Sequence, residues 1–389
     1  MRILIATDSY KPNVDGVSVF LSRLTEQLVA KGHEVAVIAP SPTYQSFLEK
    51  DHGVVIFRQG SIKPIRTKAW FFSPFPYPTV YQAVKKFSPD VVHINLPFNI
   101  GLATLRAARR IGVPVVASCH TIPGNVTANF KFMGPTVKAL DVFLWQYFRW
   151  FYNHCDFITT PTPTAIRMLN QDNSITKPLL AISNGIDTEV FRAGQESTKL
   201  RERLKVPLKT VVLYTGRLDK EKELDVLVGA MPSVLKEIPA HFMIAGEGTE
   251  RDNLEKLARK LRVSSHLTFA GFLEEKEFPL IYNIASVFAI SSPVELQSIV
   301  TLEAMSSGLP VVGVKAGALP ELIQNGVNGF LFPEGSISKM AGAIVRILKD
   351  EELRRKFSRN SREIVVKKHS LEATAEKYLE VYRKVLEFK

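Results

Sequence analysis

The chain has 389 residues, of which 46% are hydrophobic and 23% are charged, and it carries a net charge of +12. This length suits two domains of about 150–200 residues each, and the composition is typical of a soluble globular protein. The two cysteines, Cys119 and Cys155, argue against a disulfide framework and have no metal-ligand spacing, which favours a reduced, cytoplasmic setting. No apolar window is long enough for a transmembrane helix, and the N-terminal MRILIATDSY predicts a buried strand rather than a signal peptide.

The positive charge is concentrated in the first half of the chain. Residues 1–186 hold 19 Lys/Arg against 10 Asp/Glu, a net charge of +9, whereas the remainder has a net charge of +3. Such an excess attracts nucleic acid or an anionic membrane surface. The sequence has no RNA-binding or helix-turn-helix signature, so we expect no nucleic-acid partner and favour the membrane.

The first half has the pattern of a doubly wound parallel sheet. Apolar, β-rich runs at residues 1–6 and 34–40 flank an amphipathic helical stretch at 17–31, which predicts a β–α–β unit. Further strand-like runs follow at 54–57, 91–94, 113–118 and 157–160. Helical stretches such as 101–111 lie between them, and ligands of such a sheet gather at the carboxyl ends of its strands.

Two positions near these strand ends are candidate ligand contacts. Gly16 lies where the loop after the first strand enters the helix. A glycine there lets phosphates approach the backbone closely, although it fits a simple turn equally well. His120 directly follows the run at 113–118. An isolated histidine is more often structural than functional, so the residues alone leave its role open.

Two segments of the first half, 57–87 and 130–152, combine aromatic with basic residues. Rings at headgroup depth and cations on lipid phosphates are what a membrane-seated surface needs. The alternative is that the rings belong to the core and the cations to a solvated face. Together with the charge asymmetry, the segments favour a membrane- and acceptor-facing side, to which we assign Lys63, Arg66, Lys68, Trp70 and Phe71.

The second half begins again with a strand-like run at 210–215. This run leads into the sequence GRLDKEK, which contains Gly216, Arg217 and Lys222. Two cations at the carboxyl end of a strand can neutralise a diphosphate leaving group, Arg as a bidentate partner and Lys as a point charge. The alternative is a solvated charged turn. The next strand, at 241–245, is followed by Gly-Glu-Gly, which fits either a plain turn or a loop near a nucleotide.

The stretch 291–321 carries two carboxylates, Glu295 and Glu303, eight residues apart. If a helix starts near Ser298, its first backbone N–H groups have no partner inside the helix and carry partial positive charge, which makes that end a cradle for phosphate. Glu295 then stands just before the helix, and Glu303 lies more than a turn inside it. This geometry suits a sugar on one side of the phosphates and a ribose on the other. The spacing alone also fits a surface helix with two unrelated glutamates.

Together these motifs resemble a known family. The E-x7-E spacing followed by Gly-Leu-Pro-Val-Val, and the pattern GRL-x-x-x-K, resemble the retaining, nucleotide-sugar-dependent glycosyltransferases of GT-B family 4. The string ISNGIDTEVF resembles the hinge between the two domains of these enzymes. The loop DSYKPNVDGVSVF resembles their donor-facing loop, although many members carry Gly-Gly where this chain has Asp15-Gly16. The resemblance spans nearly the whole chain, to residue 332.

The resemblance implies the α/β fold called GT-B, in which two facing Rossmann-like domains with parallel sheets enclose a cleft. We expect an acceptor-binding domain at residues 1–190 and a nucleotide-sugar-binding domain at 191–370. A terminal helix at 371–389 is expected to cross back to the first domain.

It also implies roles for individual residues. The catalytic group comprises Arg217, Lys222, Glu295 and His120, and the donor-binding group comprises Gly16, Gly216, Ser298, Ile299, Val300 and Glu303. Arg217 and Lys222 bind the diphosphate together with the N–H groups of the helix start. Glu303 holds the ribose, Glu295 the hexose, and His120 the sugar from the opposite side. No metal or other cofactor is expected, and no dedicated general base, because in this family the departing phosphate is thought to take the acceptor proton.

We therefore expect a metal-independent, retaining hexosyltransferase that uses UDP-glucose, or alternatively GDP-mannose. The DSYKPNVDGVSVF loop and the ELQSIV string are most similar to diacylglycerol and phosphatidylinositol glycosyltransferases, so the expected acceptor is a membrane glycerolipid and the expected location is the inner face of the cytoplasmic membrane. A soluble or polysaccharide acceptor is the alternative within the family. From other classes, a non-catalytic sugar-nucleotide-binding protein and a nucleotide-sugar epimerase are alternatives. The oligomeric state is left open.

Overall fold

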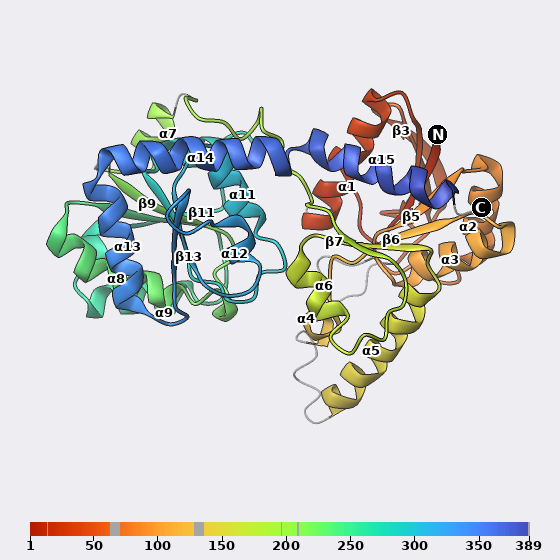
Figure 1. The fold of residues 1–389 in the computed structure, drawn as a ribbon, viewed down its shortest axis with the longest axis horizontal. Coiled ribbons are helices and arrows are strands. Elements are labelled where there is room, and N and C mark those ends of the chain that lie inside the picture. The colour runs from red at the N-terminus through yellow and green to blue at the C-terminus, as the bar shows by residue number, and fades with distance from the viewer. Residues whose placement is uncertain (14, 63–70, 128–135, 196, 208–209, 388–389) are drawn as a thin grey trace. The chain divides into compact units, whose positions relative to one another are not determined.

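The computed structural model describes residues 1–13, 15–62, 71–127, 136–195, 197–207 and 210–387. The chain forms two compact units (Figure 1). Unit 1 comprises residues 1–185 and 371–389, and unit 2 comprises residues 186–370. Each unit is a Rossmann-like α/β body, because each sheet is built mainly from parallel strands joined through helices.

Unit 1 contains an eight-stranded sheet with the order β3-β4-β2-β1-β5-β6-β7-β8. Its strands are β1 (Arg2–Ala6), β2 (Glu34–Pro40), β3 (Phe47–Asp51), β4 (Val54–Gln59), β5 (Val91–Ile94), β6 (Val115–Ser118), β7 (Phe157–Thr160) and β8 (Leu179–Ala181). Its helices are α1 (Gly16–Ala30), α2 (Tyr77–Phe87), α3 (Asn99–Ile111), α4 (Pro123–Thr127), α5 (Thr136–Asn153), α6 (Pro163–Leu169) and α15 (Leu371–Glu387).

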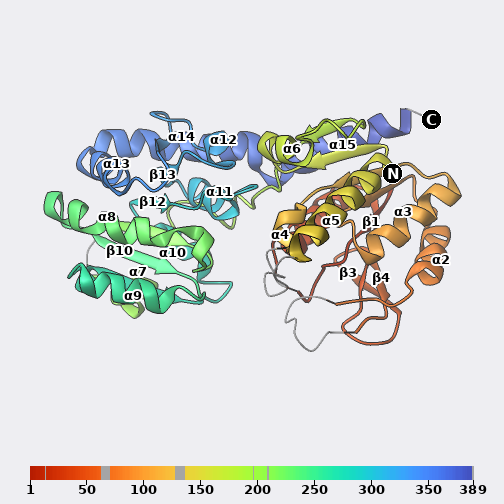
Figure 2. The same cartoon turned by 90° about the horizontal axis from the view of Figure 1, so that it is seen from below.

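Helices cover both faces of this sheet. Along β1, Ile3 and Ile5 pack into a core shared with α1 and α15, whereas Leu4 and Ala6 pack into a core shared with α2, α3 and α5. Helices α2 and α3 lie side by side on that second face (Figure 2). Successive side chains of a strand point to opposite faces, so a strand buried on both faces is apolar at every position.

The edge of the sheet differs from the sequence-based expectation. β3 pairs antiparallel with β4, whereas all other neighbouring strands of unit 1 are parallel. The sequence of β3, FLEKD, is half-exposed and was not predicted as a strand. An edge strand with one solvated side lacks the unbroken apolar run by which the buried strands are identified.

The last helix, α15, belongs to the core of unit 1. Its Tyr382 and Tyr378 are fully buried and reach polar groups of the sheet. The Tyr382 hydroxyl lies 2.7 Å from Nδ1 of His93 in β5, and the Tyr378 hydroxyl lies 3.2 Å from Oγ of Ser118 in β6. His93 Nε2 is also 2.7 Å from Ser118 Oγ. This buried network fixes the position of α15 on the sheet, because each polar group depends on its neighbours for a partner.

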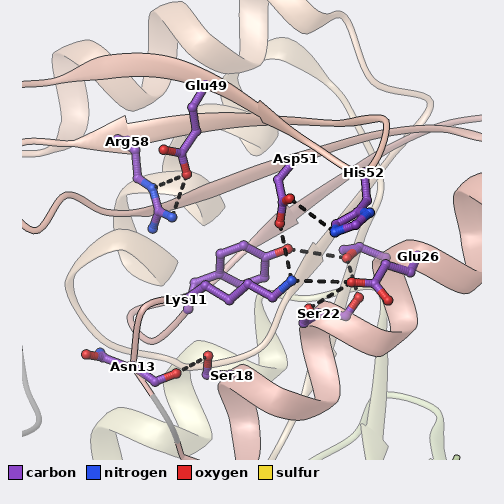
Figure 3. A network of polar contacts seen from close by, with 11 residues as sticks. Lys11, Asn13, Ser18, Ser22, Glu26, Glu49, Asp51, His52 and Arg58 are labelled. Carbon is purple, nitrogen blue, oxygen red and sulfur yellow. Dashed lines mark hydrogen bonds and ion pairs between the residues drawn. The ribbon is translucent and has the colours of Figure 1, made fainter.

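The loop between β1 and α1 is tied to the rest of unit 1 by Lys11 (Figure 3). The ammonium nitrogen of Lys11 lies 3.3 Å from a carboxylate oxygen of Glu26 in α1 and 3.2 Å from one of Asp51 in β3. His52 approaches the same Asp51 carboxylate at 3.5 Å. The loop that the sequence marks as donor-facing is therefore held between a helix and the edge hairpin.

Unit 2 contains a six-stranded sheet with the order β11-β10-β9-β12-β13-β14, in which all neighbours are parallel. Its strands are β9 (Val211–Thr215), β10 (His241–Ala245), β11 (Leu267–Gly271), β12 (Val287–Ile290), β13 (Val311–Val314) and β14 (Gly329–Phe332). Its helices are α7 (Thr198–Arg203), α8 (Leu224–Glu237), α9 (Arg251–Lys260), α10 (Phe278–Ile284), α11 (Ile299–Ser306), α12 (Leu319–Leu322), α13 (Ile337–Lys349) and α14 (Glu351–His369). Two short 3₁₀ turns are η2 (Lys220–Lys222) and η3 (Ser264–His266).

Candidate active site

The strand order of unit 2 reverses between β9 and β12. From β9 the chain proceeds outward through β10 to β11, and it then returns to β12 on the other side of β9. In open α/β sheets, ligands bind at such a reversal, outside the carboxyl ends of the strands. Two loops leave the sheet there: one after β9, with Gly216, Arg217 and Lys222, and one after β12, with Glu295 and Ser298. The topology thus brings together motifs that are far apart in the sequence.

The two loops are joined by an ion pair. The ammonium nitrogen of Lys222 lies 2.8 Å from Oε1 of Glu295, and the two side chains are only 17% and 13% exposed. The Ser291 hydroxyl donates to the carbonyl of Lys222 at 2.9 Å and holds the same two loops together through the backbone. A predicted phosphate-binding cation and a predicted hexose-binding carboxylate are therefore direct neighbours.

Glu295 is also supported by the loop after β13. The backbone N–H of Ala318 donates to the carbonyl of Glu295 at 2.9 Å. Gly317, with φ +53°, packs so closely that a Cβ there would lie 2.8 Å from the carbonyl oxygen of Pro293 and 2.9 Å from that of Glu295. Only glycine fits this close approach without displacing the backbone of Glu295. Gly317 was not among the predicted site residues, although a glycine three residues after the end of a buried strand, β13 (Val311–Val314), is a recognisable signal.

Helix α11 begins as the sequence predicts. Ser298 is the N-cap, and its hydroxyl accepts hydrogen bonds from the backbone N–H of Thr301 at 3.4 Å and from the Thr301 hydroxyl at 2.8 Å. The N–H groups of Ile299 and Val300 belong to the first turn and have no acceptor within the helix. Partial positive charge therefore gathers at this helix end.

Glu303 lies inside α11 and is 7% exposed. Its Oε2 accepts a hydrogen bond of 2.7 Å from the hydroxyl of Tyr282, a fully buried residue of α10. The Tyr282 hydroxyl also lies 2.8 Å from Oγ1 of Thr215, the last residue of β9. The sequence did not point to Tyr282, because its position in the apolar stretch FPLIYNI is typical of a core ring.

Arg217 pairs with other carboxylates than Lys222 does. Its side chain is 68% exposed, and its guanidinium pairs with the carboxylates of Asp219 and Glu221, the latter at 2.8 Å. The two predicted cations thus have separate partners in this structure. Arg217 is the more accessible of the two, and its ion pairs are open to water and easily exchanged.

The glycines of the two loops after β9 and β10 have a structural explanation. Gly216 and Gly246 both have φ near +137°, and a Cβ on Gly246 would lie 1.9 Å from the carbonyl oxygen of Gly216. A Cβ on Gly248 would meet the backbone of Leu218 at 2.4 Å. The Gly-Glu-Gly sequence therefore fits the close packing of one loop on the other, which supports the plain-turn interpretation.

In unit 1, His120 lies just beyond the carboxyl end of β6. Its Nε2–H donates to Oδ1 of Asn95 at 3.0 Å, and its ring packs against Phe20 at a centroid distance of 5.2 Å. Burial lowers the pKa of His120 to about 4, although Asp15 acts in the opposite direction, so the ring is neutral near pH 7. Because Nε2 holds the proton, Nδ1 is the ring's hydrogen-bond acceptor. Asn95, which fixes this arrangement, was not singled out from the sequence.

Gly16, the other predicted contact of unit 1, is the first residue of α1. Its neighbour Asp15 caps the helix by accepting from the N–H groups of Val17 and Ser18, each at 3.0 Å. A carboxylate therefore already occupies this helix end. A Cβ on Gly16 would meet nothing within 4 Å, so the protein's own packing does not require the glycine.

Besides Asp15, unit 1 has a second carboxylate at a helix N-terminus, that of Asp8, which was not singled out from the sequence. Asp8 follows β1 and accepts hydrogen bonds from the backbone N–H groups of Ile100 at 2.8 Å and Gly101 at 3.4 Å, at the start of α3. Burial raises the pKa of Asp8 to about 6, and these two bonds limit the rise.

The predicted membrane-facing residues are only partly within the described chain. Lys63, Arg66, Lys68 and Trp70 lie outside the described residues, and Phe71 is half-buried. The other rings of the two aromatic segments divide between core and surface. Phe148, Phe151 and Tyr152 are fully buried, whereas Phe72, Phe75, Phe143 and Trp150 are exposed. The core interpretation is therefore correct for some rings, and for the exposed rings the membrane-facing interpretation stays a prediction.

Among the described residues, no group of three or more His, Cys, Asp and Glu side chains is arranged to hold a metal ion. No helix within the described ranges combines the length and the apolar character needed to cross a bilayer.

Two family models match the chain, "Glycosyltransferase Family 4" over residues 14–190 and "Glycosyl transferases group 1" over residues 196–364. A GDP-mannose-dependent alpha-mannosyltransferase of Mycobacterium tuberculosis is 30% identical over 362 residues, which cover 90% of this chain and 89% of the relative. An alpha-monoglucosyldiacylglycerol synthase of Acholeplasma laidlawii is 27% identical over 389 residues, which cover 96% and 95% of the two chains.

The fold is that of known GT-B structures. The crystal structure of HepE from Anabaena in complex with UDP has a TM-score of 0.75 to this protein and 21% identity, with 99% of this chain and all of the other covered. The structural match covers both Rossmann-like units, and each unit is also matched by one of the two family models. The chain therefore belongs to the family 4 glycosyltransferases of GT-B fold.

Proposed function

We propose that the protein is a retaining glycosyltransferase that moves a hexose from a nucleotide diphosphate sugar to a membrane glycerolipid. The observation that carries this proposal is the Lys222–Glu295 ion pair at the strand-order reversal of unit 2, beside the N-terminus of α11. A cation and a helix N-terminus together suit a diphosphate, and the adjacent carboxylate suits sugar hydroxyl groups.

The roles of the donor-site residues follow from this placement. The N–H groups of Ser298, Ile299 and Val300 and the side chain of Lys222 bind the diphosphate. Arg217 exchanges its exposed partners for a phosphate oxygen, because an exposed ion pair is weak and a bidentate phosphate contact is strong. We also propose Gly216, in the loop after β9, and Gly16, the first residue of α1, as donor contacts through their backbone.

The sugar and the ribose lie on either side of the diphosphate. Glu295 accepts hydrogen bonds from hexose hydroxyl groups, and Glu303 accepts them from the ribose. The neutral His120 offers Nδ1 to a hydroxyl of the transferred sugar.

In the transfer step, the bond between the anomeric carbon and the β-phosphate oxygen breaks, and a bond to the acceptor hydroxyl oxygen forms on the same face. The acceptor proton passes to the departing phosphate oxygen. Lys222 and Arg217 stabilise the negative charge that develops on this leaving group. These two cations supply the neutralisation that a divalent metal provides elsewhere, so we propose that the reaction needs no metal, and activity should persist in EDTA.

A glycerolipid is the proposed acceptor because of one named relative and one surface of unit 1. The relative is the synthase of Acholeplasma laidlawii, whose name specifies a glucosyldiacylglycerol. UDP-glucose remains the preferred donor. GDP-mannose is the alternative, and the relative from Mycobacterium tuberculosis favours it by name.

The surface, which we call the hairpin surface, comprises the exposed apolar residues Tyr44, Phe47, Leu48, Ile62, Phe72 and Phe75. Its segments are held side by side: Ser61 N–H donates to the Thr43 carbonyl at 2.9 Å, and Ile62 and Phe72 exchange backbone hydrogen bonds of 2.8 and 2.9 Å. Large exposed apolar patches mark interaction sites, and we propose that these neighbouring segments present one at the edge of the sheet. The surface belongs to the half of the chain that carries most of the positive charge, so it suits a bilayer that contains anionic lipids. We propose that the protein is peripheral on the inner face of the cytoplasmic membrane.

Release of free nucleoside diphosphate tests this function. Wild type should release it slowly from UDP-glucose or GDP-mannose alone, and faster when diacylglycerol liposomes are added. Arg217→Ala should abolish release in both cases. Arg355→Ala is the matched control, because Arg355 is 71% exposed and pairs with Glu351 one helical turn away.

The other outcomes separate the alternatives. Acceleration by a soluble sugar or alcohol instead of liposomes would establish a soluble acceptor. Tight donor binding with no release under any condition would favour a non-catalytic sugar-nucleotide-binding protein. Conversion of UDP-GlcNAc into a different sugar nucleotide would point to an epimerase.

A further inference from the structure

A chain of three buried polar groups runs from β9 to α11 in unit 2. The Thr215 hydroxyl lies 2.8 Å from the Tyr282 hydroxyl, which lies 2.7 Å from Oε2 of Glu303. Thr215 and Tyr282 have no exposed surface, and Glu303 is 7% exposed. These residues come from three elements, β9, α10 and α11.

The direction of each hydrogen bond in this chain follows from the chemistry of its members. An ionised carboxylate only accepts, so the single hydroxyl proton of Tyr282 is donated to Glu303. The oxygen of Tyr282 is then left as an acceptor, and Thr215 donates to it. The order of donation is therefore Thr215 to Tyr282 to Glu303. Burial, followed by the nearby Glu303 charge, raises the pKa of Tyr282 well above its ordinary value, so the phenol keeps its proton near neutral pH.

The ring of Tyr282 is fixed independently of these hydrogen bonds. It packs edge-on against Phe191 and Phe278, with centroid distances of 5.9 and 5.8 Å, and lies 6.3 Å from Phe288. A phenol held in this way places its hydroxyl at a defined point. Glutamate, in contrast, has three rotatable bonds, so the position of the Glu303 carboxylate depends on the hydrogen bonds that it accepts.

We infer that Tyr282, supported by Thr215, is a positioning residue that aims the Glu303 carboxylate at the ribose of the nucleotide sugar. This inference rests on the proposed function, in which Glu303 holds the ribose. Tyr282 does not touch the donor. It acts by engaging Oε2 before the nucleotide arrives, so that Glu303 need not be ordered on binding. Recognition of the ribose hydroxyl groups thus depends on a residue outside the E-x7-E motif.

The inference predicts an effect on hydroxyl recognition and not on nucleotide binding in general. We would titrate the protein calorimetrically with UDP and with 2′,3′-dideoxy-UDP, and in parallel with GDP and its dideoxy counterpart. Wild type should prefer the ribonucleotide. Tyr282→Phe keeps the ring but removes the hydroxyl, so Glu303 loses its donor and Thr215 its acceptor. This variant should bind the ribonucleotide about tenfold more weakly and the dideoxynucleotide unchanged, because the loss reaches the nucleotide only through the Glu303 carboxylate. Thr215→Val should act in the same direction with a smaller effect.

Two controls sharpen the test. Tyr382→Phe also removes a buried tyrosine hydroxyl, but in unit 1, and should leave the preference intact. In a Glu303→Gln background, Tyr282→Phe should have a much smaller effect on the preference, because the ionised acceptor is gone.

The results distinguish failure of the inference from failure of the proposed function. Equal weakening of both nucleotides by Tyr282→Phe, or a preference that stays at the wild-type value, would overturn the positioning role while leaving ribose recognition by Glu303 in place. A wild type that does not distinguish the ribonucleotide from the dideoxynucleotide would remove the role of Glu303 itself, and the inference with it. Should Tyr282→Phe not fold, Thr215→Val tests the same chain from its other end.

Discussion

The ammonium nitrogen of Lys222 lies 2.8 Å from a carboxylate oxygen of Glu295, although 73 residues separate them in the sequence. The contact exists because β9 and β12 are neighbours in the sheet and both loops leave it at the same edge. Little solvent reaches either side chain. The pair therefore has two possible purposes, stability of unit 2 and chemistry at the donor site, and the first prediction separates them.

Lys222→Met should leave the Glu295 carboxylate shielded from water without its cation. Loss of one partner from a buried pair reduces the free energy of unfolding by about 3 kcal/mol, and somewhat less for a pair that is partly solvated. Donor turnover should fall by about 10²–10³-fold, as for removal of one group that stabilises developing charge. The double variant Lys222→Met/Glu295→Gln should recover stability in urea unfolding but not turnover. Turnover that recovers together with stability would mean that Lys222 acts only through the fold.

Gly317→Ala should displace the backbone of Glu295, because the two loops are in close contact. Alanine in a left-handed conformation costs about 1–2 kcal/mol wherever it is placed. At Gly317 the added Cβ also meets the backbone of Pro293 and Glu295 at 2.8–2.9 Å, so the loop must shift. Donor turnover should fall by about tenfold, since small misplacements of catalytic groups have effects of this size or larger. Gly326→Ala is the control, because Gly326 has φ +80° and open space around it. Equal turnover in the two variants would contradict the support of Glu295 by Gly317.

Stability of unit 1 should fall as the pH is lowered below about 6.5, in part because of His93. Burial lowers the pKa of His93 to about 3, so the folded state holds the ring neutral while the unfolded state takes up a proton. Between pH 6.5 and 3 the unfolded state therefore binds more protons, and the loss amounts to at most about 1.4 kcal/mol per pH unit. His120 contributes in the same direction down to pH 4, whereas Asp8, with its pKa raised to about 6, acts in the opposite direction between about pH 4 and 6.

His93→Gln isolates the contribution of His93 to this pH dependence. All three tryptophans belong to unit 1, so urea unfolding followed by tryptophan fluorescence reports on that unit. The variant is expected to be less stable than wild type at pH 7.5, because the hydrogen bonds of the His93 ring with Ser118 and Tyr382 are lost or weakened. Its stability should nevertheless fall less steeply between pH 6.5 and 4.5 than that of wild type. Parallel slopes for the two proteins would contradict the neutral state assigned to His93.

The hairpin surface is proposed to bind anionic liposomes through its rings, together with the predicted cations Lys63, Arg66 and Lys68, which follow Ile62 in the sequence. Phe75→Ser removes a ring that is 92% exposed, so co-sedimentation with liposomes should fall while unfolding is unaffected. Charge reversal at Lys63, Arg66 and Lys68 should also weaken binding, and more strongly at low salt, where charges are least screened. Phe272→Ser is the control, because Phe272 is 78% exposed but belongs to unit 2. If Phe75→Ser and the charge-reversal variant sediment with liposomes as well as wild type and Phe272→Ser do, the hairpin surface is excluded as the docking site.

Much of the fold could be predicted from the sequence because its strands are buried on both faces. The run Glu34–Pro40 is β2 with the predicted bounds, and α1 differs from the predicted helix by one residue at each end. β3 could not be predicted, because its polar and exposed sequence is a strand only through its pairing with β4.

The site is predictable as a set of local motifs, but its contacts are not. Arg217, Lys222, Glu295 and Glu303 each stand in a recognisable string, and the sequence places the first three near strand or helix ends and Glu303 inside a helix. Which partner each side chain has depends on strand order, as the separate ion pairs of Arg217 and Lys222 illustrate. Supporting residues such as Tyr282 remain hidden, because a buried tyrosine in an apolar helix has the same pattern whether or not its hydroxyl serves a neighbour.

Transfer of labelled hexose into lipid tests the central claim most directly. The protein would be incubated with labelled UDP-glucose or GDP-mannose and mixed liposomes of diacylglycerol and phosphatidylinositol, followed by extraction with organic solvent. Label should appear in the organic phase with wild type and not with Lys222→Met. It should come from only one of the two donors, which identifies the nucleotide sugar. Label that stays in the aqueous phase with both donors, while nucleoside diphosphate is still released, would contradict a lipid acceptor.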